Sequence, residues 1–338
     1  MDKRKSLLSA YFWIMCLFTL ILDTKTVIQG AGDGIDLCIR VLIPSIFPFL
    51  VICSMVTASL PSSLPFPQSI GRLLKLPAGA EDLFLLGLLG GYPVGAAMVS
   101  NAVRSKRISA RDGARLMAFC SNPGPSFLFG MGAVLFPSPF YCAALWLIQI
   151  LSAAIVGILT PGSPSTSRTN SVTKLPMDRN IRRSISTMAI ICAWVVLFRI
   201  VITVLERWTL WFLPESAQII VRGLLELANG IVSLQEIQNL GQRMVLFSML
   251  LSFGGLCVWM QTISVADGVP TKYYLPGKIT QCAISVLLTF ALQIALPAQQ
   301  RTKTHPIFPA ICILVPIVYS YIQRKIEKRS RNSDLIGV

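Results

Sequence analysis

Residues 86–130 decide the fold of this chain, and they read LGLLGGYPVGAAMVSN at 86–101, RSKRISARDGAR at 104–115 and LMAFCSNPGPSFLFG at 116–130. Two apolar pieces are interrupted by glycine and proline, and a basic run separates them. A similar pattern returns as LLELANGIVSL at 224–234 and SFGGLCVWMQ at 252–261. Apolar segments that break at matching places in two halves of a chain are typical of transporter binding sites.

The composition is that of a membrane protein. Of the 338 residues, 54% are hydrophobic and 13% are charged, and the mean hydropathy is +0.66, whereas a soluble domain carries roughly 25% charged residues. Apolar runs of membrane-spanning length recur from end to end. We therefore predict an all-α polytopic membrane protein in a lipid bilayer, with about eight transmembrane helices plus two re-entrant hairpins and no separate soluble domain.

The apolar runs divide the chain into two similar halves. Residues 1–34 hold a first span and a polar connection at 23–34, and residues 35–159 form a first repeat with a hairpin at 83–103. A basic, Ser/Thr/Pro-rich linker at 160–184 leads to a second repeat, 185–296, with a hairpin at 217–235. Residues 297–338 hold the last span and a basic tail. The expected spans lie near 7–22, 35–60, 114–135, 140–159, 185–205, 244–263, 277–296 and 307–322.

Loop charge bears on whether the broken segments cross the membrane. The net charge is +15, and we assign the basic residues to cytoplasmic loops rather than to a nucleic-acid-binding surface. With a cytoplasmic N-terminus and both segments folded back, 21 Lys and Arg lie in inside segments and 5 in outside ones. If 83–103 crossed instead, the basic runs 104–115 and 160–184 would move outside. The charges therefore favour inverted repeats whose hairpins enter from opposite faces, with both termini cytoplasmic.

The first candidate solute-binding residues lie at the break of the first hairpin. Gly91 to Gly95 is a GxxxG pattern, and Pro93 favours a turn because proline removes an amide donor. We expect Gly91, Tyr92 and Pro93 to form a hairpin tip near the solute. The alternative is ordinary close packing of helices through small residues.

A second candidate group is CSNPGPS at 120–126, where two prolines interrupt an apolar run. Unwound backbone at membrane depth is tolerated only when it is buried in protein or faces a water-filled cavity. We expect the polar groups there to face such a cavity, and the restarting helix to point its positive end at an anion. The alternative is a structural kink capped by Asn122. The predicted binding residues are Ser121, Asn122, Gly124 and Ser126.

The second half adds Glu226, Asn229, Ser252 and Gln261 to the predicted binding residues. Glu226 and Asn229 are three apart and therefore share a helix face. An intramembrane carboxylate is costly, so Glu226 is a candidate for binding a coupling proton or Na⁺. The alternative for Glu226 is an ion pair with Arg222, four residues earlier. We assign no role to Arg199.

Enzymatic function has little support in this sequence. The nine cysteines are scattered without a CxxC pair and there is one histidine, so we predict no metal site, no cofactor and no catalytic residue. The expected partner is a small-molecule solute rather than nucleic acid. A homo-oligomer is compatible with the pattern but is not specified by it.

At GGYPVGA (90–96), FCSNPGPSFLFG (119–130), ELANG (226–230) and SFGGLCVWMQ (252–261), the chain resembles the YlbJ family of sporulation integral membrane proteins, also called stage V sporulation protein V. That family belongs to a wider group labelled nucleoside recognition or Gate domain. The resemblance covers most of residues 35–296.

This resemblance implies a membrane protein of endospore-forming bacteria that moves dipicolinic acid, a small planar dianion, across the outer forespore membrane. We therefore expect a transporter of a small polar or anionic solute, with dipicolinate as the first candidate. The alternatives are a nucleoside permease, which the name of the wider group implies, and a non-transporting assembly factor for spore maturation.

Overall fold

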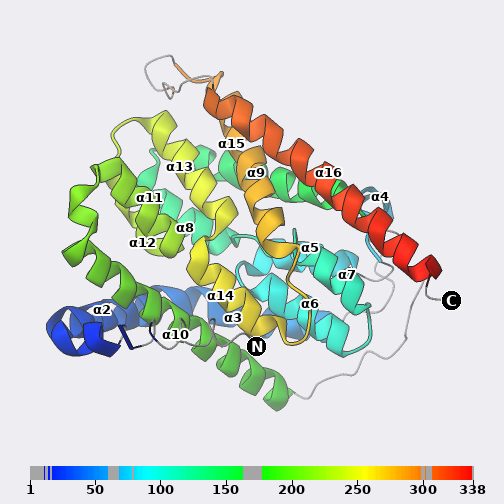
Figure 1. The fold of residues 1–338 in the computed structure, drawn as a ribbon, viewed down its shortest axis with the longest axis horizontal. Coiled ribbons are helices and arrows are strands. Elements are labelled where there is room, and N and C mark those ends of the chain that lie inside the picture. The colour runs from blue at the N-terminus through cyan, green and yellow to red at the C-terminus, as the bar shows by residue number, and fades with distance from the viewer. Residues whose placement is uncertain are drawn as a thin grey trace.

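The computed structural model describes residues 11, 14–15, 17–59, 68–77, 80–162, 177–297, 301 and 307–336. Every regular element within these ranges is a helix, so the prediction of an all-α protein is confirmed (Figure 1). The helices are α2 (Thr24–Leu37), η1 (Cys38–Leu42, a π-helix), α3 (Ile43–Ser59), α4 (Gln68–Leu73), α5 (Glu81–Gly90), α6 (Val94–Arg104), α7 (Ala110–Leu116), α8 (Pro125–Leu135), α9 (Pro139–Leu159), α10 (Met177–Trp208), η2 (Leu210–Phe212), α11 (Glu215–Leu225), α12 (Leu227–Ser233), η3 (Leu234–Glu236), α13 (Leu240–Phe253), α14 (Gly255–Ala266), α15 (Tyr274–Gln293) and α16 (Ile307–Ile336).

Five stretches of the described chain are helical, long and apolar enough to cross a membrane: Thr24–Cys53, Pro139–Leu159, Met177–Trp208, Leu240–Ala266 and Tyr274–Gln293. This number is smaller than the eight spans expected. The span expected at 114–135 is two short helices, α7 and α8, joined by non-helical residues. Part of the first expected span, 7–22, and much of the linker at 160–184 lie outside the described residues.

The stretch 23–34 was predicted as a polar connection, and this prediction is wrong because most of it is helix α2. Its glycines explain the difference. A Cβ on Gly30 would lie 3.0 Å from the Cα of Ile200, and one on Gly34 would lie 2.9 Å from the Cα of Val196. Small residues four apart therefore let α2 lie directly against α10, and this packing stabilises a helix of low hydrophobicity.

The first hairpin reverses direction at Gly91, where φ is +80°. Helices α5 and α6 pack against each other on either side of this turn. A Cβ on Gly87 would lie 3.5 Å from the Cα of Gly95, although a straight helix would separate these residues by about 12 Å. At the open end, Arg107 donates two hydrogen bonds to the carboxylate of Asp82. The segment therefore begins and ends at the same end of the molecule.

The second hairpin reverses at Glu226, between α11 and α12. The backbones of Gly223 and Gly230 touch across this turn, leaving no room for a Cβ on Gly230. Arg222 of α11 pairs with Glu206, near the C-terminal end of α10, at 2.8 Å. The open end of this hairpin lies near the C-terminal end of α10, because α10 ends at Trp208 and α11 begins shortly afterwards at Glu215.

Two further helix breaks lie beside the hairpins. Residues 117–124 separate α7 from α8, and the backbones of Gly91 and Gly124 are in contact. Gly254, with φ +81°, separates α13 from α14. A Cβ there would lie 3.4 Å from the ring of Tyr92. The two hairpin tips and the two helix breaks are thus brought to one region of the fold.

Candidate functional site

A buried lysine lies at the centre of this region. Lys278 of α15 is 0% exposed, and its ammonium group donates to the backbone carbonyl of Ser121. It also lies 3.3 Å from Asn122 Oδ1 and 2.6 Å from Gln281 Oε1. Gln281 in turn donates to Asn122 Oδ1 at 2.9 Å. None of the ion pairs among the described residues includes Lys278. The amino group of Lys278 therefore lies in the interior among neutral acceptors.

Tyr92 connects this lysine to the second half of the chain. Lys278 Nζ lies 3.3 Å from the Tyr92 hydroxyl and 5.0 Å from the centre of its ring. The hydroxyl lies within donating distance of the carbonyls of Leu251 (3.0 Å) and Ser252 (3.2 Å). These carbonyls are at the C-terminal end of α13, where the break leaves backbone acceptors without intrahelical partners. The Tyr92 hydroxyl, at the tip of the first hairpin, thus supplies a hydrogen-bond donor to the carbonyls that the helix break in the second half leaves unpaired.

The polar network continues across three helices. Ser252 Oγ lies 3.0 Å from Gln149 Oε1 of α9 and 2.5 Å from Ser285 Oγ of α15. Gln149 also donates to the carbonyl of Ser248 at 3.3 Å. All four side chains are 0–1% exposed. Nearby, the Ser121 hydroxyl is buried and has no hydrogen-bond partner in the described part of the chain.

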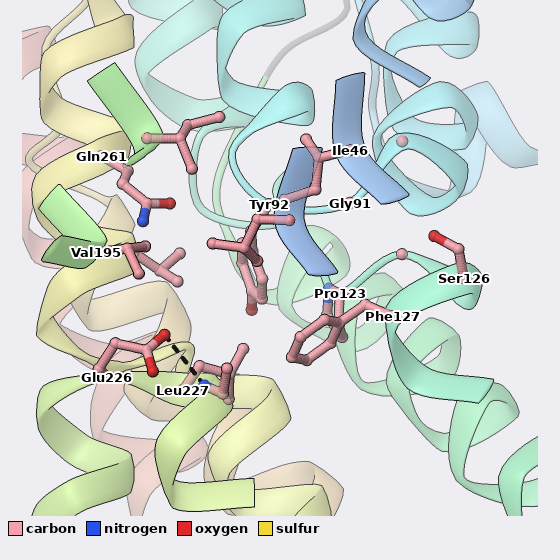
Figure 2. A pocket seen from close by; sticks show the side chains of 16 residues that line it. Ile46, Gly91, Tyr92, Pro123, Ser126, Phe127, Val195, Glu226, Leu227 and Gln261 are labelled. Carbon is pink, nitrogen blue, oxygen red and sulfur yellow. Dashed lines mark hydrogen bonds between the residues drawn. The ribbon is translucent and has the colours of Figure 1, made fainter. Parts of the chain in front are cut away.

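A pocket lies on the other side of Tyr92, between the two halves of the chain. Figure 2 shows Tyr92, Glu226, Gln261 and Phe127 around it. Both hairpin tips and the helix break before α8 contribute to its wall, and α14 contributes Val258 and Gln261. Most of the remaining wall is apolar. Its lining includes Gly91, Gly124, Ser126, Leu42, Ile191 and Val258.

Glu226 is buried at the tip of the second hairpin and caps the helix that follows it. Its carboxylate accepts hydrogen bonds from the backbone amides of Ala228 (3.1 Å) and Asn229 (2.8 Å). The side-chain amide of Asn229 donates to it as well, at 2.6 Å. The alternative that Glu226 pairs with Arg222 is wrong, because Arg222 pairs with Glu206. Glu226 therefore presents to the pocket a carboxylate held by a helix N-terminus.

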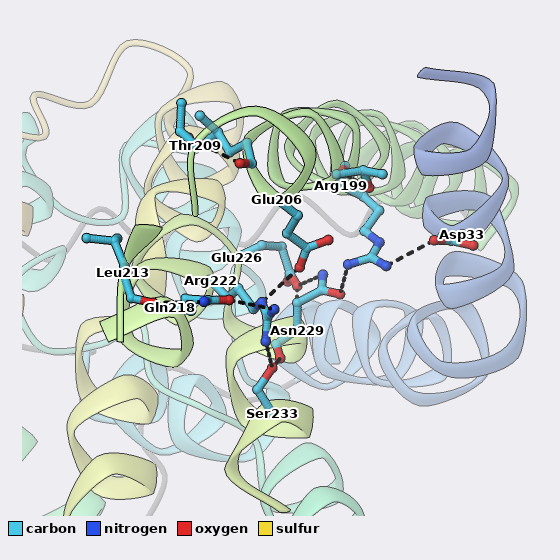
Figure 3. Close-up of polar contacts among 12 residues, drawn as sticks. Asp33, Arg199, Glu206, Thr209, Leu213, Gln218, Arg222, Glu226, Asn229 and Ser233 are labelled. Carbon is cyan, nitrogen blue, oxygen red and sulfur yellow. Dashed lines mark hydrogen bonds and ion pairs between the residues drawn. The ribbon is translucent and has the colours of Figure 1, made fainter. Parts of the chain in front are cut away.

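A polar chain leads from Glu226 to the surface, as Figure 3 shows. Arg199 of α10 donates to Asn229 Oδ1 at 2.9 Å and to Asp33 Oδ2 of α2 at 2.9 Å. The side chain of Asp33 is 43% exposed and that of Arg199 is 21% exposed. Arg199, to which the sequence assigned no role, thus links the Glu226–Asn229 pair to an exposed carboxylate.

The structure sorts the predicted binding residues into three groups. Gly91, Tyr92, Gly124, Ser126, Glu226 and Gln261 line the pocket. Ser121, Asn122 and Ser252 belong to the network around Lys278, where they are joined by Tyr92. The remaining two do not line the pocket: Pro93 begins helix α6, and Asn229 lies behind Glu226. The alternative of a kink capped by Asn122 also has support, since the Asn122 side-chain amide donates to the carbonyl of Phe119 at 2.7 Å.

Sequence reasoning missed Lys278, Gln281, Ser285, Gln149 and Ser248. A signal for three of them was present, because Lys278, Gln281 and Ser285 follow one another at intervals of three and four residues. That spacing places three polar side chains on one face of an apolar helix. Nothing local to Gln149 or Ser248 indicates that they meet.

The candidate spans, the broken helices and the buried polar centre define a polytopic α-helical integral membrane protein. Over 170 residues the chain is 25% identical to the sporulation integral membrane protein YlbJ of Bacillus subtilis (strain 168). The match includes 48% of this chain and 40% of the relative, so it spans about two fifths of that protein's length. No family model and no solved structure matches the chain.

Proposed function

We propose that this protein is a secondary transporter of a small polar or anionic solute, which binds in the pocket between the hairpin tips. The observation that carries the proposal is the meeting of both tips and both helix breaks around the pocket and Lys278. Broken helices that converge on a midplane site suit alternating access, in which one repeat moves against the other. Unwound backbone and a buried lysine amino group are costly inside a membrane, so their presence supports a functional site.

The paired hairpins support an arrangement in inverted repeats. In this proposal both hairpins are re-entrant, and their tips reach the middle of the bilayer from opposite sides. The first hairpin is open at the end where Arg107 meets Asp82, and the second is open near the C-terminal end of α10. The tips Tyr92 and Glu226 nevertheless line one pocket.

Dipicolinate is the first candidate solute, and sporulation the proposed setting. The similarity to YlbJ supports the setting, and the ammonium of Lys278 would offset anionic charge. Glu226 would repel a dianion, so it would carry a proton or bind Na⁺ when the solute enters, which makes it the proposed coupling group. A nucleoside permease is the second candidate, because Glu226, Gln261 and the Tyr92 ring offer hydrogen bonds and a stacking surface for a base.

Flux into proteoliposomes tests the proposal. We expect the purified protein to move labelled dipicolinate saturably, and excess unlabelled uridine to leave the rate unchanged. Flux that uridine reduces would favour the nucleoside permease. Folded protein that moves neither solute under any imposed proton or Na⁺ gradient would contradict transport and favour an assembly factor.

Variants of the proposed site separate transport from a scaffold role. We expect Asn122→Ala and Glu226→Gln each to reduce flux at least about tenfold, an activation difference of about 1.4 kcal/mol, while protein level holds. The matched control is Glu215→Gln, which removes an exposed carboxylate from the start of α11 and should leave flux unchanged. If sporulation depends on Glu226 but flux does not, the assembly factor is the better explanation.

A further inference from the structure

A second, larger cavity lies toward the N-terminal end of α10. Its empty volume, counted together with the solvent at its mouth, is about 1120 Å³. Three arginines line it: Arg104 at the end of α6, and Arg182 and Arg183 near the start of α10. The carboxylate in its lining is Asp267, which pairs with Arg104 at 2.9 Å.

The same helix faces line this cavity and the pocket at the hairpin tips. On α10, Val195 and Ile191 line the pocket, and Thr187 and Arg183 line the cavity. These residues are four apart and form one stripe along the helix. The cavity therefore follows the pocket along the same face of α10, toward the N-terminal end of that helix.

Three other elements repeat this arrangement. Ile46 lines the pocket and Leu50 the cavity on α3, and Gln261 lines the pocket and Ser264 the cavity on α14. On the first hairpin, Tyr92 lines the pocket and the α6 residues that follow it line the cavity. Four elements thus line both spaces, so the cavity and the pocket follow one another along the same elements.

The charge of the cavity differs from that of the pocket. Arg183 donates to Asn101 Oδ1 at 3.1 Å, which leaves other guanidinium N–H groups available. Arg182 is exposed and has no ion pair within the described ranges of the chain. Because the carboxylate of Asp267 neutralises the charge of Arg104, the positive charges of Arg182 and Arg183 remain in the cavity. The hydroxyls of Ser186 and Thr187 stand beside them.

We propose that this cavity is an anion-binding vestibule, in which Arg182 and Arg183 bind the carboxylates of a small solute before it moves between these four elements to the pocket. Planar guanidinium groups bind carboxylates in a bidentate manner. A positively charged, low-dielectric recess also concentrates anions about tenfold or more. The inference rests on the proposed transport function for its biological meaning, but the binding itself can be measured without transport.

A reporter cysteine measures the electrostatics of the cavity directly. Ser186→Cys places a thiol in the cavity wall, and its reaction rates with an anionic and a cationic methanethiosulfonate are compared in nanodiscs of zwitterionic lipid. We expect the ratio of anionic to cationic rate to fall about tenfold or more when Arg182→Gln and Arg183→Gln are added. Arg207→Gln, at the other end of α10 and 64% exposed, is the matched control and should leave the ratio unchanged.

Dipicolinate should slow modification of the Ser186→Cys protein and should lose this effect in the double arginine variant. Arg182→Lys with Arg183→Lys keeps the charge and should retain the rate ratio. If the glutamine variant does not fold, raising the salt from about 50 mM to about 500 mM should remove the preference in the parent protein. A rate ratio that neither the glutamines nor salt alters would overturn the proposal.

The phosphate of an anionic lipid offers the same chemistry as a carboxylate solute. The reaction rates are therefore also measured in nanodiscs that contain phosphatidylglycerol. If phosphatidylglycerol abolishes the anion preference and dipicolinate never protects, the cavity is a lipid site and the vestibule is refuted. If dipicolinate protects but no flux is found in proteoliposomes, the vestibule stands and the transporter assignment fails.

Discussion

At the scale of single residues, Lys278 is the most informative side chain. Its ammonium is fully buried, and its partners are a carbonyl, two amide oxygens and a hydroxyl. Burying a lysine amino group without a carboxylate partner costs free energy, so a sequence selected only for stability would replace it by an apolar residue. Its presence is therefore best explained by function.

The first prediction concerns the replacement of this charge. Lys278→Met keeps most of the side-chain volume and removes the buried charge, so we expect the melting temperature to stay the same or rise while flux falls at least about tenfold. Melting can be followed with a fluorescent thiol reagent, since Cys120 and Cys257 are buried and free. Lys272→Met, an exposed lysine close by, is the control. Unchanged flux in Lys278→Met would remove the lysine from the transport site.

At the scale of elements, glycines set how closely the broken segments approach each other. A Cβ on Gly95 of α6 would overlap the carbonyl oxygen of Cys120 and lie 3.1 Å from the Cα of Ser121. The first hairpin therefore lies directly against the unwound segment that contacts Lys278. A shift of either element would move Tyr92 away from its carbonyl partners.

A pair of glycine variants tests this contact. Gly95→Ala should destabilise the protein by about 1–3 kcal/mol, because backbone rather than a flexible side chain must move. The melting temperature should fall by several degrees. Gly130→Ala, in α8 with nothing within 4 Å of the added carbon, should leave stability unchanged or raise it by up to about 1 kcal/mol. Equal melting temperatures for the two variants would show that the close approach is not needed.

At the scale of the whole molecule, Arg115 of α7 brings two connections of the first half together at one end. Arg115 donates to the carbonyls of Leu74 and Lys75 and to those of Gly157 and Thr160. The connections before α5 and after α9 therefore meet at the same end as the base of the first hairpin. The prediction from loop charge puts these segments on one side of the membrane, the cytoplasmic one, and their meeting at one end is compatible with it.

Thiol labelling from each side of the membrane tests this orientation. We expect Arg111→Cys, exposed on α7, to react with an impermeant reagent only in inside-out vesicles. Glu215→Cys, exposed at the start of α11, should react only in right-side-out vesicles. Reaction of both positions from the same side would mean that the two hairpins do not enter from opposite faces.

The sequence alone determined the class of protein and the positions of its breaks. Hydropathy, glycine, proline and loop charge are local properties, so they predicted an all-α membrane protein, the turn at Gly91 and the interruption at Cys120 to Gly124. They also identified Tyr92, Asn122 and Glu226, because a polar or turn-forming residue in an apolar run is conspicuous without any knowledge of its neighbours.

The tertiary structure alone decided which of these residues meet. Lys278 and Ser121 are 157 residues apart, and no local pattern specifies that contact. The same holds for Arg199, whose partners lie on α2 and α12, and for α2, which is helical because glycines fit it against α10. A buried polar group takes its role from the partners that packing supplies, and packing depends on the whole chain.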